Sequence, residues 1–426
     1  MRAEKIHLGA RIPAEPAGFG PSMRRLRDAH RVRASASMDY EIVKLFRNPV
    51  PSGNCFHEFL LRQAATQGAT SPADRLEFLN QAGEALDADA YRLRFQAAWR
   101  ALTSTGCAAD GRTAMWRRYL ASRNVDSSNA QSVMEYVEKT AAGYDGLYRA
   151  ERKSLGGGAT GNSIAFRSRS GLFVTSIFDT AFRLDSLIAW IRGQDPALRW
   201  KRVLVVGPGL NIVDQFLGTQ VPVSSPQPVC LLESLLAHRL GDGSTRIDLA
   251  DLSPEVVRHW NEAARRSSGY RLLGYLGSDA PAREYLETFG ARIRTAEREW
   301  FASQPHAGEI LFGGHAGRFR AIGPGDSELA VRDLVARPAA LRRFSATEAD
   351  VVTDRIAENE TYDAIVATNL LLYFEPAEAS LAVFNMSRML VRGGYLLVTE
   401  NLDALLPPGH PLRQVRSGLT YVYRKQ

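Results

Sequence analysis

The chain has 426 residues, 45% of them hydrophobic, so it can bury a sizeable core and more than one domain. No uninterrupted apolar run approaches the roughly 20 residues that a membrane-spanning helix needs, and the start lacks the apolar core of a secretory signal, so we expect a cytoplasmic protein without membrane association. The net charge is +7, but five of these positive charges belong to residues 1–37, which leaves too little elsewhere for a nucleic-acid partner.

The cysteine and histidine patterns argue against a disulfide framework and against a metal site. The three cysteines, Cys55, Cys107 and Cys230, lie far apart and form no CxxC pair. The eight histidines are scattered, without an HxxxH or HxH spacing. We therefore expect free thiols and no bound metal.

The N-terminal part of the chain divides into three predicted segments. Residues 1–37 are basic, contain proline and alanine, and show no clear apolar periodicity, so we expect a disordered basic extension. We favour an extension without a role of its own, and the alternative is a targeting or tail-binding segment. Residues 38–154 show helical patterns and predict a helical N-terminal domain. Residues 155–170 begin with a glycine-rich run, which is typical of a linker or mobile loop.

From residue 171 onward, strand-like and helix-like segments alternate, which predicts an α/β doubly wound sheet. The predicted order is an amphipathic helix at 184–192, a strand at 202–206, a helix near 228–240, a strand at 245–250, a helix from Pro254, a strand from Tyr362, a helix near 377–390, a strand at 395–400 and an edge strand at 419–424. Residues 267–345 show no clear pattern.

The strand predicted at 202–206 runs directly into a glycine turn, Gly207, Pro208 and Gly209. Glycine has no Cβ, so the turn can adopt unusual dihedral angles and a ligand can approach the backbone. Asp251 follows the next predicted strand, where such sheets place an acid for ribose hydroxyls. This pair predicts a cofactor that contains a nucleoside. The alternatives are an ordinary strand–helix turn and an acid that only caps a helix.

A dinucleotide is a poor match to this turn. The G-x-G-x-x-G fingerprint needs a third glycine where this chain has Ile212. Asp251 also lies 44 positions after Gly207, about twice the usual interval. An NAD-dependent oxidoreductase is the alternative. A shift of the melting temperature on addition of NAD(H) would support it.

The C-terminal half resembles the class I S-adenosylmethionine-dependent methyltransferases. The resemblance covers residues 170–426 and rests on the order of four features: the glycine turn, Asp251, the run Asn369–Phe374, and Leu390–Gly394 before a strand. The family has L-x-P-G-G at the last of these, and Arg392 stands in place of the proline. The resemblance implies a mostly parallel, seven-stranded Rossmann-like methyltransferase sheet over residues 171–426, with the helical domain in front of it.

One run is also similar to the chemotaxis receptor glutamate methyltransferases. Asn369–Phe374 matches the N-x-x-x-Y-F pattern of that family. We find no convincing counterpart of that family's small β-subdomain or of a receptor-tethering segment. The specific substrate is therefore not carried over.

The resemblance also implies roles for single residues in binding S-adenosylmethionine. The turn Gly207–Gly209 would lie against the methionine part of the cofactor, because backbone N–H groups and a helix start attract its carboxylate. Asp251 would accept the ribose hydroxyls, Leu252 would pack on adenine, and Asp350 would contact the adenine amino group. Asp350 could instead be a solvated loop acid.

Asn369 and Tyr373 are the candidates for orienting the group that accepts the methyl. Asn369 also ends a strand that faces the cofactor, whereas Tyr373 could instead belong to the core. Thr175, Phe178 and Arg183 precede the first strand and could fold over the cofactor or simply pack against the fold.

We therefore predict an S-adenosylmethionine-dependent methyltransferase that acts on a small molecule or on a protein side chain. A sulfonium is already an activated methyl donor, so this chemistry needs alignment and a dry pocket more than acid–base groups. The alternative is a non-catalytic cofactor-binding or scaffold protein on the same fold. The sequence indicates neither the acceptor nor an oligomeric state.

Overall fold

The computed structural model describes residues 19–47, 112–155, 180–212, 223–267, 269–275, 314–320, 328–354, 356–357 and 361–426. The predictions for Cys55, Cys107, Thr175 and Phe178, and for the linker beyond Leu155, lie outside these residues. Among the described residues, no helix is both long and apolar enough to cross a membrane.

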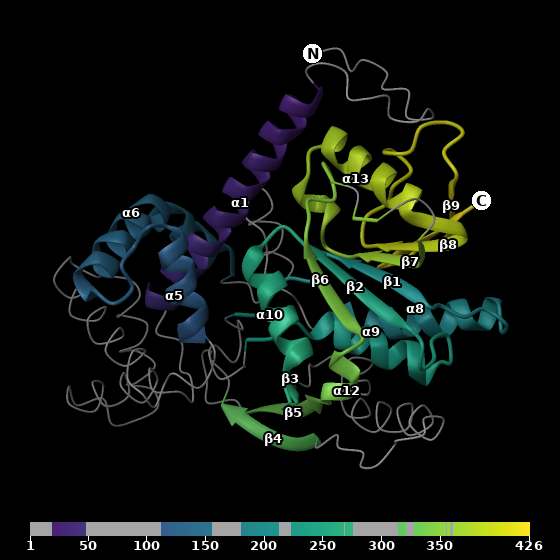
Figure 1. Cartoon of the computed structure of the whole chain (residues 1–426), viewed down its shortest axis with the longest axis horizontal. Coiled ribbons are helices and arrows are strands. Elements are labelled where there is room, and N and C mark those ends of the chain that lie inside the picture. Colours follow the sequence, from purple (N-terminus) through teal and green to yellow (C-terminus); the bar gives the residue numbers. More distant parts are fainter. Residues whose placement is uncertain are drawn as a thin grey trace.

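A seven-stranded, mostly parallel sheet organises the C-terminal half of the chain (Figure 1). Its spatial order is β6-β2-β1-β7-β8-β10-β9, and only β10 and β9 introduce antiparallel pairs. This arrangement confirms the predicted doubly wound α/β fold. The strands are β1 (Arg202–Val206), β2 (Arg246–Asp251), β6 (Phe344–Glu348), β7 (Tyr362–Ala367), β8 (Leu390–Val398), β9 (Leu412–Arg416) and β10 (Tyr421–Lys425).

The C-terminal strands correct one prediction. We expected residues 419–424 to form an edge strand, but β10 pairs with β8 on one side and with β9 on the other. Val422 and Tyr423 are fully buried, and each belongs to a different one of the two core clusters. β9 is the true edge, and three of its five residues are exposed. A polar edge strand lacks the apolar run that identifies a buried strand, so the sequence pattern does not reveal it.

Helices cover both faces of the sheet (Figure 1). Val203 and Val205 belong to one core cluster, whereas Leu204 and Val206, from the same strand, belong to the other. Alternate residues of β1 therefore face opposite layers, as the period of two in a strand requires. The helices around the sheet are α8 (Thr180–Gln194), α9 (Pro226–Ala237), α10 (Pro254–Arg265), α12 (Pro338–Leu341) and α13 (Pro376–Met389).

The three described helices of the N-terminal part are α1 (Phe19–Arg47), α5 (Arg112–Ser122) and α6 (Ala130–Leu155). Asp39 of α1 accepts hydrogen bonds from the hydroxyls of Tyr119 on α5, at 2.7 Å, and of Tyr136 on α6. These bonds tie the three helices together. The helical character predicted for residues 38–154 agrees with the described helices, while the proposed domain boundaries stay predictions.

Helix α1 corrects the prediction of a disordered extension. Residues 19–37, which we expected to be disordered, form most of this helix, and residues 1–18 lie outside the described part. The helix has no apolar stripe, and its contacts with the sheet domain include the ion pairs of Arg27, His30 and Arg31. Periodicity of apolar residues therefore gives no sign of it.

A second, three-stranded antiparallel sheet occupies part of the region without a clear sequence pattern. Its order is β3 (Tyr270–Tyr275), β5 (Glu328–Ala336) and β4 (Gly314–Arg320). The sequence shows no clear pattern for residues 267–345, so this sheet was not predicted. β4 contains two glycines and alternating arginines, and such a strand lacks the apolar run that marks a buried one.

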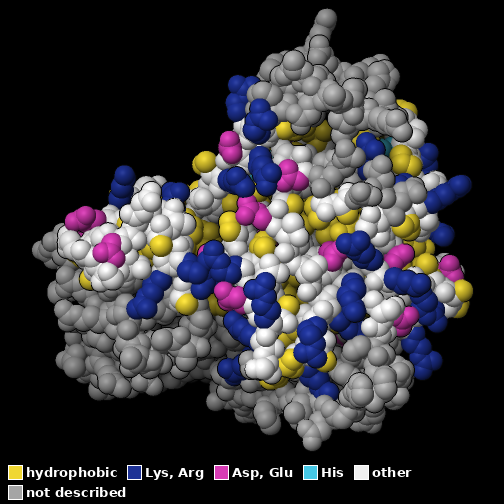
Figure 2. Space-filling model, in the orientation of Figure 1, with side chains coloured by type: hydrophobic (Ala, Val, Ile, Leu, Met, Phe, Trp, Pro, Cys, Tyr) yellow, Lys and Arg dark blue, Asp and Glu magenta, His cyan; other side chains and the backbone are white. Residues whose placement is uncertain are grey.

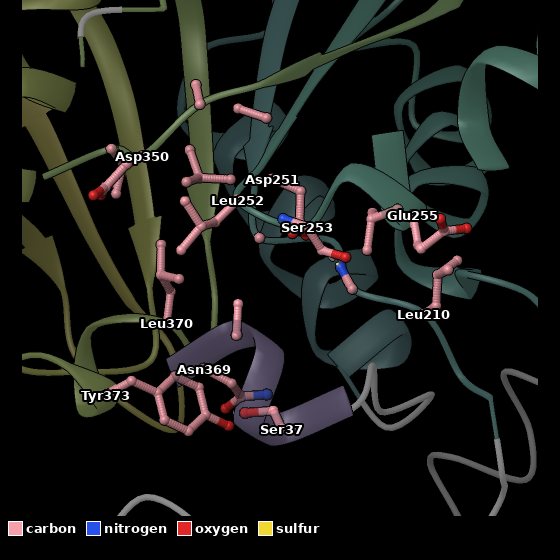
Figure 3. A pocket seen from close by; sticks show the side chains of 18 of the residues that line it. Ser37, Leu210, Asp251, Leu252, Ser253, Glu255, Asp350, Asn369, Leu370 and Tyr373 are labelled. Carbon is pink, nitrogen blue, oxygen red and sulfur yellow. Dashed lines mark hydrogen bonds between the residues drawn. The ribbon is translucent and has the colours of Figure 1, made fainter. Parts of the chain in front are cut away.

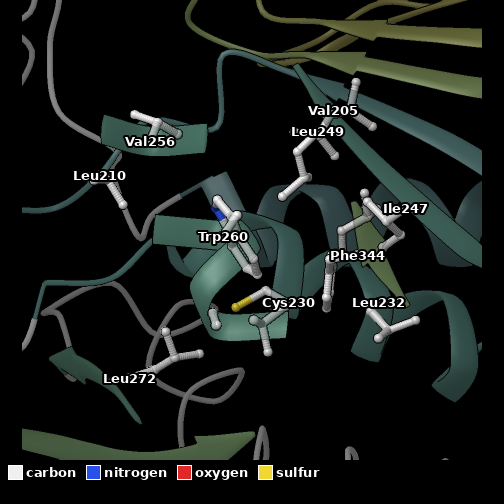
Figure 4. Close-up of a cluster of buried hydrophobic side chains, with 14 of the residues drawn as sticks. Val205, Leu210, Cys230, Leu232, Ile247, Leu249, Val256, Trp260, Leu272 and Phe344 are labelled. Atoms are coloured by element: carbon white, nitrogen blue, oxygen red, sulfur yellow. The ribbon is translucent and has the colours of Figure 1, made fainter. Parts of the chain in front are cut away.

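The hydrophobic cluster beneath β1 and β2 centres on Trp260 of α10 (Figure 4). The Trp260 side chain is 1% exposed, and its ring centroid lies 4.9 Å from that of Phe344 and 5.3 Å from that of Tyr270. Trp260 thus packs β6 of the large sheet and β3 of the small sheet against one helix. Cys230 is buried in the same cluster.

We expect Trp260→Ala to lower the free energy of unfolding by about 3–5 kcal/mol, because it leaves a large cavity between the two sheets. The matched control is Leu419→Ala, since Leu419 is 72% exposed and should change stability by less than about 0.5 kcal/mol. Urea unfolding of both variants measures this, and equal stabilities would contradict the packing described here.

Candidate functional site

The glycine turn and Asp251 lie side by side at the carboxyl ends of β1 and β2. The two strands are parallel neighbours, with Val206 opposite Ala250. The Gly207 N–H donates to the Ala250 carbonyl at 2.8 Å, which continues the pairing by one residue. The Gly209 N–H then donates to Oδ2 of Asp251 at 3.2 Å. The structure therefore brings together the two features that the sequence singled out.

Glycine is required in this turn for two reasons. Gly207 and Gly209 have φ angles of +66° and +61°, a conformation that side chains with a Cβ disfavour. A Cβ on Gly207 would also lie 3.0 Å from Cδ1 of Leu370, which follows β7. The turn thus leaves its backbone accessible on one side and packs closely against the next strand on the other.

Asp251 is a half-buried carboxylate in this cleft between strand ends. Its Oδ1 accepts the Ser253 N–H at 2.8 Å, and its Oδ2 accepts the Gly209 N–H. Burial raises the pKa of the Asp251 carboxyl to about 6, although these N–H donors oppose the rise. The hydrogen bond from Ser253 supports the turn before α10. The alternative that Asp251 caps a helix therefore describes part of the role of this residue.

A cavity opens in front of these groups (Figure 3). Seven residues predicted for the site line it: Gly207, Gly209, Asp251, Leu252, Asp350, Asn369 and Tyr373. Pro208 is not among the lining residues, because it is buried behind the turn, where its carbonyl accepts the Ser225 hydroxyl at 3.1 Å. Arg183 of α8 does not line the cavity either. The functional roles of all these residues stay predictions.

Asp350 follows β6 and is only 2% exposed, so it is not a solvated loop acid. Its Oδ1 accepts the Val352 N–H at 2.9 Å, and its Oδ2 lies 2.7 Å from Nδ1 of His30. His30 belongs to α1, more than 300 positions earlier in the chain. The carboxylate is therefore engaged on both oxygens at the edge of the cavity.

Asn369 follows β7 in a strained conformation, with φ of +53°. Its N–H donates to Oγ1 of Thr399 at 2.7 Å, and the Thr399 hydroxyl donates to Oε1 of Glu400 at 2.8 Å. Burial raises the pKa of Glu400, since desolvation of the carboxylate outweighs these donors. The end of β8 thus holds the turn that carries Asn369 at the cavity.

Tyr373 combines both roles that the sequence left open, because it is 6% exposed and also lines the cavity. It ends the short 3₁₀ helix η2 (Leu371–Tyr373). Figure 3 shows Tyr373, Asn369 and Ser37 grouped at one end of the cavity. Ser37 comes from α1, so this polar group joins the two halves of the chain.

Several lining residues were missed by the sequence reading. Ala34, Ser37 and Met38 come from α1, while Glu255 and Val256 come from the first turn of α10. The basic residues of α1 recur at helical spacing. Acidic residues lie at the end of β6 and in the turn after it, but the sequence did not predict this strand. The sequence does not show that these two segments are neighbours in space, so neither pattern alone places α1 at the site.

No group of three or more His, Cys, Asp or Glu side chains within the described ranges is arranged to hold a metal ion. Lys, Arg and His are likewise not found among the cavity-lining residues that the structure describes. The lining acids are Asp251, Glu255 and Asp350. Glu255 pairs with Arg118 at 3.2 Å and with Arg258 at 2.8 Å.

A scan against protein-family models found no match, and a search of curated proteins found no similar sequence. Solved structures match at low similarity. N-methyltransferase NodS from Bradyrhizobium japonicum WM9, in complex with S-adenosyl-L-homocysteine, is 12% identical, with 57% of this chain and 85% of NodS covered and a TM-score of 0.26. A methyltransferase from Geobacter sulfurreducens is 13% identical, with 68% of this chain and 96% of that chain covered and a TM-score of 0.27.

The [4+2]-cyclase SpnF is 15% identical, with a TM-score of 0.24, and the match covers 53% of this chain and 49% of SpnF. The chain therefore spans about half the length of SpnF. Identities and TM-scores this low identify no function for this chain.

We expect the raised pKa of Asp251 to make the folded state less stable as pH rises from about 4 to about 6. The folded state holds this proton to a higher pH than the unfolded state does, so unfolding releases the proton in that window. The free energy of unfolding therefore decreases by at most about 3 kcal/mol as the pH rises. Asp251→Asn removes this contribution. The measurement is urea unfolding of both proteins from pH 4 to 7, and a constant difference in stability between them would contradict the assignment.

Proposed function

We propose that this chain is a methyltransferase that uses S-adenosylmethionine. The observation that carries the proposal is the pair formed by the glycine turn and Asp251, hydrogen-bonded to each other at the carboxyl ends of adjacent parallel strands and facing a cavity. In open α/β sheets, ligands bind at this end of the strands, and an acid after the second strand accepts ribose hydroxyls.

The residues present fit this cofactor. Asp251 offers carboxylate oxygens to the ribose, and Leu252 offers an apolar side chain to the adenine. Gly207 and Gly209 expose backbone to the methionine part, whereas buried Pro208 supports the turn from behind. Because the described lining includes acids but no Lys, Arg or His, it does not repel a sulfonium.

When bound, the cofactor supplies a methyl group already activated as a sulfonium. The contribution of the chain is alignment, and in-line positioning can remove on the order of 7–11 kcal/mol of barrier. We assign the orientation of the acceptor to Asn369 and Tyr373, which lie together at one end of the cavity. The Thr399 hydroxyl contributes by holding the Asn369 backbone in its left-handed conformation.

We propose a small molecule or a protein side chain as the acceptor, in the cytoplasm. Nucleic acid is not the expected acceptor, because Figure 2 shows Lys and Arg side chains spread over this face with Asp and Glu among them. The local similarity of Asn369–Phe374 to the chemotaxis receptor glutamate methyltransferases supports only the methyltransferase class. It does not extend to their substrate.

The second candidate is a cofactor-binding protein without turnover, which the absence of an assigned general base motivates. Arg392 does not favour it, because this residue, in place of the family's proline, is exposed on β8 and is not among the cavity-lining residues. Product formation from any acceptor would exclude this candidate. An NAD-dependent enzyme is disfavoured because Ile212, buried at the cavity wall, occupies the position of the third glycine.

We expect the full chain to bind S-adenosylhomocysteine, and Asp251→Asn to weaken that binding by roughly 10- to 100-fold, since an ionised acceptor is replaced by a neutral amide. Isothermal calorimetry measures this. Asp403→Asn, the same change at an exposed acid, is the control and should leave the affinity unchanged. Absence of binding at millimolar ligand would reject the proposal.

The affinity of the wild-type chain should also fall as pH drops below about 6, because the proton then occupies an oxygen that the ribose hydroxyls need. Asp251→Asn should lack this pH dependence. An equal pH dependence in both proteins would place the ribose elsewhere.

A further inference from the structure

One face of α1 carries positive side chains that pair with acids of the sheet domain. Arg27 lies 3.2 Å from Asp354 and Arg31 lies 2.6 Å from Glu348. Both acids come from the end of β6 or from the turn after it. The surplus positive charge of the N-terminal segment therefore has a local counterpart on the sheet domain.

The innermost contact of α1 is His30. This side chain is 1% exposed, its Nδ1 lies 2.7 Å from Oδ2 of Asp350, and its Nε2 lies 3.5 Å from Oε1 of Glu378 on α13. The ring also packs against Phe374, with centroids 5.3 Å apart. Burial lowers the pKa of His30, but the hydrogen bond and charge of Asp350 and the charge of Glu378 outweigh this effect and raise it.

The Asp350 carboxylate therefore interacts directly with α1. One of its oxygens accepts the Val352 N–H, the other meets His30, and its side chain is 1% exposed. A carboxylate in this state has little surface left for an adenine amino group. Its geometry indicates that it anchors a helix.

The next turn of α1 reaches the cavity itself. Ala34, Ser37 and Met38 line the cavity, whereas Val32, on the opposite face of the helix, is 68% exposed. Figure 3 shows α1, in purple, at the end of the cavity that Ser37 and Asn369 line. Arg33 donates to the carbonyl of Tyr373 and so ties the helix to η2.

We propose that α1 is a wall of the ligand site: Ala34, Ser37 and Met38 contact the bound S-adenosyl ligand, and the buried His30–Asp350 pair fastens the helix there. This inference rests on the proposed function. It assigns a binding role to a segment that resembles a dispensable basic extension, and it reassigns Asp350 from adenine recognition to anchoring.

The test compares Ala34→Trp with Val32→Trp in the full chain. Trp at position 34 fills the cavity, so we expect the affinity for S-adenosylhomocysteine, measured by calorimetry, to fall at least tenfold. Trp at position 32 points to solvent and should leave the affinity within twofold of wild type. Equal affinities of the two variants would overturn the inference while leaving the proposed function intact. If the wild-type chain does not bind S-adenosylhomocysteine, the proposed function and this inference are both wrong.

The anchor is tested by the rate at which the same ligand dissociates. His30→Ala leaves Asp350 buried without its partner and loosens α1, whereas Arg31→Ala removes a pair whose arginine side chain is 48% exposed. We expect dissociation, followed by stopped-flow fluorescence, to accelerate at least fivefold in His30→Ala and less than twofold in Arg31→Ala. Equal rates would overturn the assignment of the buried His30–Asp350 pair as the anchor of α1, even if Ala34→Trp proves poorly folded.

Discussion

The parallel pairing of β1 with β2 is the constraint on which the site depends. Parallel strands end at the same edge of a sheet, so the turn after β1 and the acid after β2 must be neighbours. The hydrogen bond from the Gly209 N–H to Asp251 expresses this adjacency directly. β7 adds the third component on the other side of β1, since Leu370, which follows it, packs closely against Gly207.

This part of the molecule was predictable because its signals are local. A run of buried apolar residues, a glycine turn and an acid after the next strand are each visible within about ten residues, and the sheet order then brings them together. Asn369 was found in the same way, as the residue that follows a buried strand. Pro208 shows the limit of such reasoning, because its neighbours face the cavity while it supports the turn from behind.

The parts that sequence did not predict lack a local signal. β9 is polar because it lies at the edge of the sheet, and in the three-stranded sheet β3 pairs with β5 residues that lie 56 to 66 positions later in the chain. Helix α1 is held by charges whose partners lie more than 300 positions away, at Glu348, Asp350 and Asp354. Charge complementarity at this separation becomes visible only when the fold places both surfaces together, which explains why the basic segment resembled a disordered tail.

The most direct measurement of the central claim is a crystal structure of the full chain with S-adenosylhomocysteine. The account predicts the ribose hydroxyls within hydrogen-bonding distance of the carboxylate that follows β2, and the methionine portion over the bare backbone of the glycine turn. A ligand located elsewhere, or a ribose that makes no contact with that carboxylate, would contradict it.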